Sequence, residues 1–135
     1  MLGLRHVALR VRNLQRALEF YSGVLGMRLE WQPDDRNAYL TTGSDNLALH
    51  EAADLTDSGA GSLDHIGFFV AAPEEVDEWG RRLEARGVTL VQQPRTHRDG
   101  ARSIYFRDPD GNLVQLLYAI RTVERTRAAS PAGAK

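Results

Sequence analysis

The chain has 135 residues, of which 42% are hydrophobic and 26% charged, as is typical of a globular domain with a core and unlike a disordered or fibrous chain. The formal net charge is −1, and the basic residues are scattered, which argues against a nucleic-acid partner. The sequence has no cysteine, no signal-peptide core and no run near the roughly 18 apolar residues of a membrane span, so we expect a cytoplasmic protein without disulfides, thiolate metal ligands or a membrane partner.

The first half of the chain predicts one helix and four strands. Residues 4–11 alternate between apolar and polar side chains, which indicates a half-buried strand. Asn13 is a suitable N-cap for a helix that Gly26 ends, and its apolar residues recur at helical spacing: Leu14, Ala17, Leu18, Tyr21 and Leu25. Three strands follow, "MRLEWQ", "AYLTTG" and "NLALHE", with "PDDRN" as the turn between the first two.

The second half repeats this order after a small, polar, glycine-rich linker at residues 53–62. The segment "LDHIGFFV" predicts a strand, and Pro73 begins a helix that Gly87 ends. The predicted buried stripe of this helix is Val76, Trp79 and Leu83. The strands "VTLVQQ", "SIYFRD" and "NLVQLLYA" complete the half, and residues 121–135 predict a flexible tail.

The two halves match residue by residue, which indicates an internal duplication. "LRHVALRV" superposes on "LDHIGFFV" without a gap, and "YLTTGSDNL" on "YFRDPDGNL", so that Tyr39 matches Tyr105 and Asn46 matches Asn112. We therefore predict an α+β fold in one domain, residues 1–120. It consists of two tandem βαβββ modules, about 4–52 and 63–119, whose curved mixed sheets surround a shared cavity.

Two histidines, His6 and His65, occupy matching positions on the first strand of each half. Both lie on the face opposite the apolar side that covers the helix. A single histidine on such a strand is more often only solvated or packed. Two imidazoles placed symmetrically on rigid strands suit a divalent first-row metal ion.

These segments carry a resemblance to a known family. "LRHVALRVRNLQRALEFYSGVLGMRLE", "LDHIGFFV" and "IYFRDPDGNLVQLL" resemble the vicinal oxygen chelate superfamily, which includes glyoxalase I, extradiol dioxygenases, fosfomycin-resistance transferases and bleomycin-binding proteins. The resemblance covers about Leu4 to Ala119 and implies one divalent metal ion, with Fe, Mn, Zn, Ni and Co all open. The implied ligands are His6, His65 and Gln115, where a glutamate is usual at the last position.

A fourth histidine, His50, is a secondary ligand candidate. The resemblance places a first-half ligand near Ala48, and alanine cannot coordinate a metal ion. His50 lies two residues further along the same face of the predicted strand. A histidine near a strand end that is only solvated is an equally good interpretation.

The reaction stays open at this level. Tyr105 and His97 resemble a catalytic pair of ring-cleaving dioxygenases, in which they would bind a substrate oxygen and assist proton transfer. The missing carboxylate weighs against that reaction, against glyoxalase chemistry and against fosfomycin-type transfer. We expect a homodimeric, metal-dependent lyase, isomerase or dioxygenase acting on a small molecule with vicinal oxygens. The alternative is a metal-free small-molecule or drug-binding protein of the bleomycin-resistance kind. In such a protein, Trp31 and Phe69 would line the binding groove.

Overall fold

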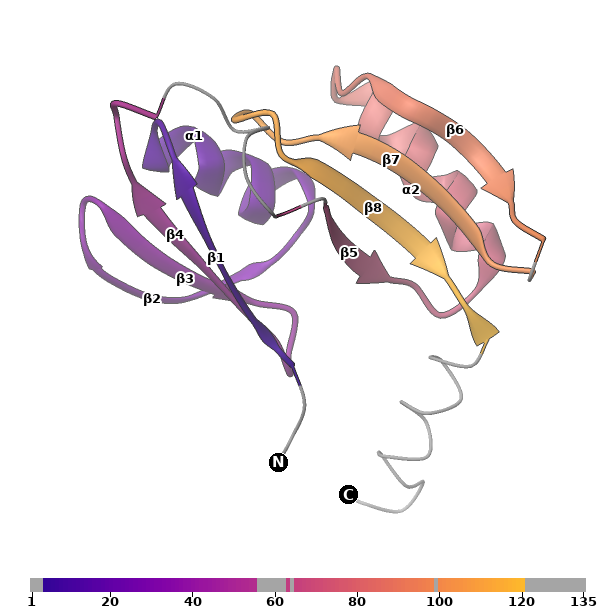
Figure 1. The fold of residues 1–135 in the computed structure, drawn as a ribbon, viewed down its shortest axis with the longest axis horizontal. Helices are drawn as coiled ribbons and strands as arrows, with labels where there is room; N and C mark the ends of the chain where they lie inside the picture. The colour runs from indigo at the N-terminus through magenta and orange to yellow at the C-terminus, as the bar shows by residue number, and fades with distance from the viewer. Residues whose placement is uncertain (1–3, 56–62, 64, 99, 121–135) are drawn as a thin grey trace, which may run out of the picture. The chain divides into compact units, whose positions relative to one another are not determined.

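The chain forms two compact units, each with one four-stranded mixed sheet (Figure 1). The computed structural model describes residues 4–55, 63, 65–98 and 100–120. The expected tail and most of the expected linker lie outside these residues. One unit contains residues 1–62 together with Asp108–Asn112, and the other contains residues 63–107 and 113–135. Two such sheets with few helices confirm the predicted α+β class and the tandem βαβββ order.

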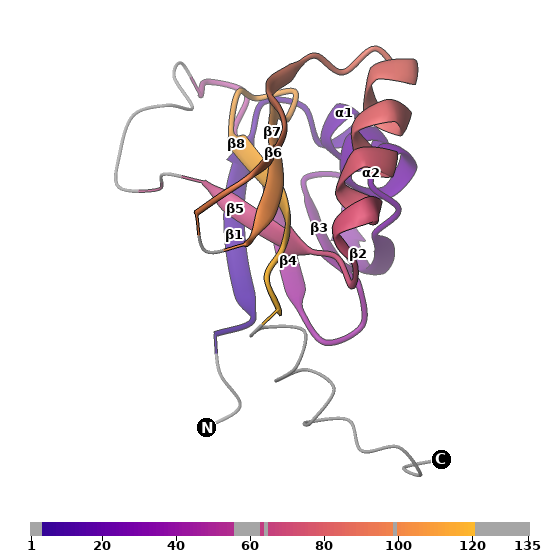
Figure 2. The same ribbon diagram turned by 90° about the vertical axis from the view of Figure 1, so that its right-hand side faces the viewer.

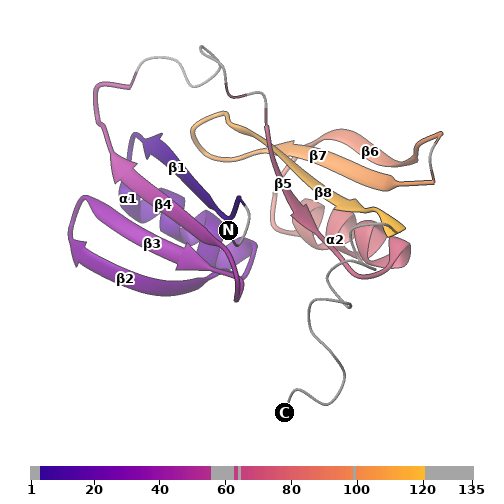
Figure 3. The same cartoon turned by 60° about the horizontal axis from the view of Figure 1, so that its bottom comes forward.

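The first unit follows the predicted element order. Its elements are β1 (His6–Val11), α1 (Leu14–Leu18), the π-helical turn η1 (Glu19–Val24), β2 (Arg28–Asp34), β3 (Asn37–Thr41) and β4 (Asn46–Glu51). The strand order is β1-β4-β3-β2, with β1 parallel to β4 and the other pairs antiparallel (Figure 3). This arrangement puts the chain's first strand beside the last strand of the module.

The helix of the first unit covers one face of this sheet. Leu9 and Val11 of β1 and Leu49 of β4 are buried on that face, as are Leu14 and Ala17 of α1. The side chain of Asn13 accepts a hydrogen bond from the Arg16 backbone N–H at 2.9 Å, which confirms the predicted N-cap. The apolar residues of the sheet and of the helix therefore form one core, and the opposite face of the sheet is left open.

The predicted helix is wider in its second half than the sequence pattern suggested. The Leu25 backbone N–H donates to the Phe20 carbonyl at 3.0 Å, a five-residue spacing that belongs to a π-helix. With this spacing, the neighbouring residues Phe20 and Tyr21 are both buried. The helix still ends before Gly26, whose φ of 83° lies in the left-handed region that glycine adopts without strain.

The second unit repeats the same topology. Its elements are β5 (Ile66–Phe69), α2 (Pro73–Ala85), β6 (Leu90–Thr96), β7 (Arg102–Arg107) and β8 (Leu113–Tyr118), in the sheet order β5-β8-β7-β6. Helix α2 runs along one face of this sheet and contacts β6, β7 and β8 (Figure 2). Val76 and Leu83 are buried as predicted, whereas Trp79 is only half-buried and lies 5.0 Å from the Arg82 guanidinium.

Two edge strands are longer than the sequence predicted. Strand β2 continues through Pro33 to Asp34, and β6 continues through Pro94 to Thr96. Proline lacks a backbone N–H, but an edge strand can accept it where that N–H would face solvent. Both strands also contain register shifts at corresponding places, after Leu29 and Trp31 in β2 and after Leu90 and Gln92 in β6. The duplication thus extends to the irregularities of the edge strands.

The gapless alignment of the two halves is broken at the last hairpin of each half, where the second half has one extra residue. Leu40 of β3 pairs with Leu47, whereas Phe106 of β7, at the matching position, pairs with Val114. The second hairpin is therefore one residue longer. In the structure the equivalent of Asn46 is Leu113 rather than Asn112.

The turn between β7 and β8 belongs to the first unit rather than the second. Asp108 Oδ2 accepts a hydrogen bond from the Tyr21 hydroxyl at 2.7 Å, and Asp110 Oδ1 accepts one from the Arg12 backbone N–H at 2.8 Å. Tyr21, Asp108 and Asp110 are all buried.

Within the described residues, none of the helices is long and apolar enough to cross a membrane.

Candidate functional site

His6 lies on the open face of the first sheet, as the alternation of β1 predicted. Its side chain is exposed, and its Nδ1 is 2.7 Å from Oδ1 of Asn46, its register partner on β4. The Asn46 amide nitrogen in turn donates to Glu30 Oε2 at 3.4 Å. The Nε2 atom of His6 is the nitrogen left for a ligand.

His50 belongs to a separate cluster on the same face. Its Nδ1 is 2.6 Å from Asn37 Oδ1, and the Asn37 amide nitrogen donates to both carboxylate oxygens of Asp34 at 2.9 and 3.1 Å. The Tyr39 ring meets the His50 ring edge-on at 5.9 Å and stacks on Trp31 at 5.2 Å. A hydrogen bond from the Arg36 backbone N–H, followed by one from the Asn37 side chain, lowers the pKa of Asp34.

The distance along β4 separates His50 from His6. His6 pairs with Asn46, four residues before His50 on the same strand, and strands rise about 3.3 Å per residue. The two imidazoles therefore stand roughly 13 Å apart along the sheet. Ligand nitrogens lie about 2 Å from a metal ion, so one ion suits His6 or His50 but not both.

The open face of the second sheet holds Gln115 at its centre. Gln115 pairs with Gly67 of β5 on one side and with Tyr105 of β7 on the other. A Cβ atom on Gly67 would lie 3.6 Å from Gln115 Oε1, so the amide oxygen reaches over the glycine. Val114 and Leu116, its chain neighbours, are buried on the helix face. Gln115 is thus a polar side chain aimed at the open face.

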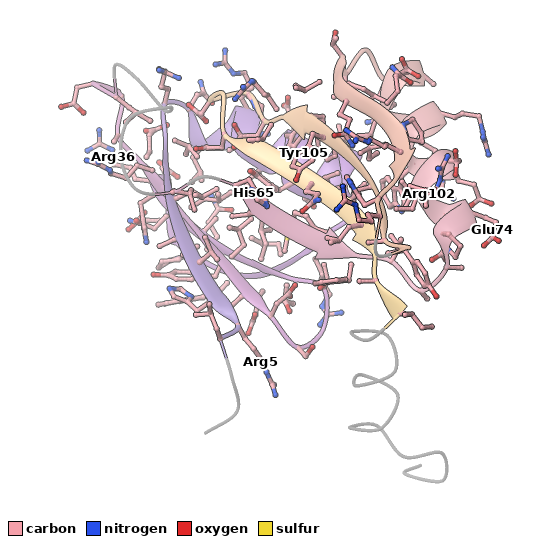
Figure 4. The ribbon with its side chains drawn as sticks, turned by 45° about the vertical axis from the view of Figure 1, so that its right-hand side comes forward. Arg5, Arg36, His65, Glu74, Arg102 and Tyr105 are labelled. Atoms are coloured by element: carbon pink, nitrogen blue, oxygen red, sulfur yellow. The ribbon has the colours of Figure 1, made fainter. Side chains whose placement is uncertain are left out.

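His65 and Tyr105 lie together on this face (Figure 4). Their rings meet edge-on at 5.6 Å, although His65 precedes β5 rather than lying within it. Because Tyr105 is the register partner of Gln115, the three predicted side chains occupy adjacent positions on one sheet. Two of the three implied ligands are thereby gathered in one unit, and Tyr105 stands beside them.

His97, the other predicted catalytic residue, follows β6 at the β6–β7 hairpin. Its Nε2 is 2.7 Å from the hydroxyl oxygen of Ser103, a fully buried side chain two residues before Tyr105. The Gln92 amide is also near that hydroxyl, at 3.4 Å. His97 therefore contacts Ser103, which lies on the same face of β7 as Tyr105 and two residues before it.

The implied ligands, His6, His65 and Gln115, are of types that bind metal ions, but none of them is a carboxylate. Among the described residues, no three His, Cys, Asp or Glu side chains gather closely enough to hold a metal ion. Imidazole nitrogens with an amide oxygen suit borderline ions such as Zn, Ni, Co and Fe better than hard ions such as Mg or Ca. Glu51 cannot supply the missing carboxylate, because its Oε1 accepts the Leu14 backbone N–H at 2.9 Å at the start of α1.

Sequence reasoning missed the asparagines that hold the histidines. Asn46 and Asn37 lie 40 and 13 residues from their histidines along the chain, and only the strand register brings them together. The available signal was cross-strand pairing: once β1 is parallel to β4, His6 faces Asn46. Ser103, which holds His97, needed the same knowledge of β6–β7 pairing.

Comparison with known proteins identifies the family. Residues 3–116 match the Glyoxalase/Bleomycin resistance protein/Dioxygenase superfamily. The chain belongs to this superfamily. It is 35% identical over 117 residues to glutathione transferase FosA of Serratia marcescens, covering 84% of this chain and 78% of that protein. It is also 32% identical over 115 residues to metallothiol transferase FosB of Shouchella clausii (strain KSM-K16), with the same coverage.

A solved member of the superfamily supports the fold. The crystal structure of lactoylglutathione lyase from Agrobacterium tumefaciens has a TM-score of 0.73 and 27% identity, and the match covers 87% of this chain and 93% of that one. The predicted superfamily is therefore confirmed. The names of these superfamily relatives support a metal ion and a small-molecule substrate in general terms, and they do not distinguish one metal from another.

Proposed function

We propose that this superfamily member is a metal-dependent enzyme acting on a small molecule that carries two neighbouring oxygens. In the proposal, His6, His65 and Gln115 hold a divalent metal ion. The supporting observation is that His65, Tyr105 and Gln115 share one open sheet face, with the Gln115 amide oxygen over Gly67. His50 is not included because it lies four residues along β4 from the register partner of His6, which is too far for both to bind one ion.

The absence of a carboxylate among the three proposed ligands limits the reactions that the site could catalyse. A bound divalent ion polarises substrate oxygens and stabilises negative charge on them. None of the three proposed ligands is a carboxylate that could remove a proton from carbon, which disfavours isomerisation. The missing carboxylate also weighed against thiol transfer in the sequence, but the names of the transferase relatives point to that reaction class, and we therefore favour addition of a thiol to an electrophilic carbon. The S–C bond forms, the C–O bond breaks, and the thiol proton ends on the released oxygen.

Tyr105 has a defined part in this proposal. Its hydroxyl would donate a hydrogen bond to the substrate oxygen that gains negative charge, and its ring meets the ring of His65 edge-on. A free thiol has a pKa near 8.5, so part of it is already thiolate at neutral pH. The reaction then needs no strong base from the protein.

Metal content tests the proposal directly. Protein purified without a histidine tag should contain close to one divalent ion per chain, and His65→Ala should lose it. His50→Ala is the matched control and should retain it. Gln115→Glu should raise the affinity for the divalent ion markedly, since a carboxylate is a stronger ligand than an amide for divalent ions. Equal, negligible metal in wild type and His65→Ala would overturn the proposal.

A second candidate function is metal-free binding of a small molecule. The observation that favours it is the neutral donor set, together with the exposed aromatics Trp31 (59% exposed) and Phe69 (52%). The same metal analysis separates the two functions. Negligible metal combined with quenching of tryptophan fluorescence by planar drug-like compounds would support binding over catalysis.

The assembly and location form the last part of the proposal. We propose a homodimer in the cytoplasm, as the sequence led us to expect. Sedimentation velocity at micromolar concentration should give a species near 30 kDa, twice the 15.0 kDa of the chain. A single species at the monomer mass would contradict the dimer without bearing on the metal site.

A further inference from the structure

We propose that Asn46, itself held by Glu30, is a positioning residue that fixes His6 in the tautomer protonated on Nδ1, so that Nε2 becomes the metal-binding nitrogen. The metal-binding half of this inference rests on the proposed function. The orienting half concerns the protein without metal and is independent of it. No motif in the sequence marks this role.

The two hydrogen bonds of Asn46 determine the tautomer. Its Nδ2 donates to Glu30 Oε2 at 3.4 Å, and a carboxylate can only accept, so the amide nitrogen must face Glu30. The amide oxygen then faces His6 Nδ1, at 2.7 Å. Since that oxygen also only accepts, the proton must be on Nδ1, and the lone pair of Nε2 is exposed on the open face.

The fold explains how the three residues meet. The parallel register of β1 and β4 places His6 directly beside Asn46. Glu30 comes from the edge strand β2, where Leu29 pairs with Leu40 and Trp31 pairs with Tyr39, so Glu30 is the extra residue of a bulge. Bulges redirect side chains and are common beside functional sites. This one lets Glu30 reach across β3 to Asn46.

Such an arrangement matters for metal binding. Histidines that bind metal ions usually donate their other ring N–H to a carboxylate, carbonyl or water, and loss of that partner typically weakens metal binding 10- to 100-fold. His6 is exposed, and without a partner its ring would be free to rotate and to change tautomer. Asn46 supplies the missing restraint through the amide oxygen, and Glu30 prevents the amide from flipping.

The same sheet contains an internal control. Asp34, Asn37 and His50 form the same sequence of carboxylate, amide and imidazole, with the Asn37 oxygen 2.6 Å from His50 Nδ1. The chemistry is alike, but His50 is not among the proposed ligands. Asn37→Leu should therefore release His50 without changing metal affinity, whereas Asn46→Leu should release His6 and weaken it.

The first test uses metal-free protein labelled with ¹⁵N-histidine. Two-bond proton–nitrogen spectra distinguish the tautomers, and wild type should show His6 protonated on Nδ1. Asn46→Leu should give a mixture of tautomers for His6 alone, and Asn37→Leu for His50 alone. Asn46→Asp should keep the Nδ1-protonated form, because a carboxylate also accepts. An unchanged His6 spectrum in Asn46→Leu would overturn the orienting role.

The second test titrates the same proteins with Ni²⁺ or Zn²⁺ alone. Asn46→Leu should weaken binding 10- to 100-fold, Asn46→Asp should restore it, and Asn37→Leu should match wild type. Equal affinity in wild type and Asn46→Leu, despite a changed tautomer, would overturn the metal-binding half. If wild type bound no metal ion, the proposed function would fall, and the spectra alone would then decide whether Asn46 orients His6.

Discussion

Replacing Tyr21 by phenylalanine tests how the β7–β8 turn is held in the first unit. The Tyr21 hydroxyl donates to Asp108 Oδ2 at 2.7 Å, and both side chains are buried. Asp108 also accepts from the Asp110 and Asn112 backbone N–H groups and from the Asn112 amide, at 2.8 to 2.9 Å. Phenylalanine keeps the ring and its edge contact with Phe20 but removes one of four donors to a buried carboxylate.

The expected loss is the value of one hydrogen bond to a charged acceptor. Such bonds contribute about 1.5 to 3 kcal/mol, so we expect Tyr21→Phe to lower the free energy of unfolding by about 2 kcal/mol. Urea unfolding followed by circular dichroism measures this. Tyr39→Phe is the matched control, since the half-exposed Tyr39 ring keeps its contacts with Trp31 and His50, and it should cost less than about 0.5 kcal/mol. Equal effects of the two substitutions would refute the reasoning.

The difference in unfolding free energy between wild type and Tyr21→Phe should depend on pH. Burial, followed by the charge and hydrogen bond of Asp108, raises the pKa of Tyr21 well above its usual value. The folded state therefore favours the protonated phenol, and the stabilisation is fully present below the unfolded pKa of about 10. It is lost as the pH rises above that value. The gap between wild type and Tyr21→Phe should be constant from pH 7 to 9 and shrink above pH 10.

Three further predictions concern the second unit. Gly67→Ala places a Cβ atom 3.3 Å from Leu117 Cδ2 and in van der Waals contact with Gln115 Oε1 at 3.6 Å, so the methyl group takes up space beside the amide oxygen and metal titration should show weaker binding; unchanged binding would mean that Gln115 has room to bind beside the added methyl group. Asp77→Asn breaks a two-point contact with Arg102 at 2.7 and 2.8 Å, and because the pair is partly exposed we expect urea unfolding to show a loss of less than about 1 kcal/mol. The Arg102 hydrogen bond lowers the pKa of Asp77, so this contribution should be present above the unfolded pKa of about 4 and be lost progressively as the pH falls below it. Ser103→Ala removes the His97 partner and should lower stability by about 1 kcal/mol while shifting the His97 ring resonances; an unshifted ring would contradict the contact.

The sequence predicted most of the fold because most strands are half-buried. Alternation in β1 and the apolar stripe of α2 are direct consequences of one face meeting the core, and the structure confirms the alternation and the buried positions of Val76 and Leu83, though not that of Trp79. The edge strand β2 is exposed along its whole length, so its pattern carries little information about where it ends. The sequence therefore predicts a turn that begins at Pro33, although an edge position accepts proline within the strand.

The sequence identifies candidate site residues only where the residue type itself marks the chemistry. His6, His65 and Gln115 stand out because duplication or family resemblance points to their positions. The residues that hold His6, His50 and His97 are ordinary asparagines and a serine, and these contacts depend on pairing across strands. A bulge in β2 decides that Glu30 reaches Asn46, and bulges leave no clear pattern in one sequence.

The one-residue difference between the two hairpins explains why the modules no longer hold their histidines alike. In the first module, Asn46 lies on β4 opposite His6. In the second, the matching asparagine, Asn112, lies in the turn and donates to Asp108, while Leu113, next to the Val114 that pairs with Ile66, lies opposite His65. The same residue type therefore orients a histidine in one half and builds a turn in the other. A single added residue was enough to separate the two roles, because strand register determines which side chains face each other.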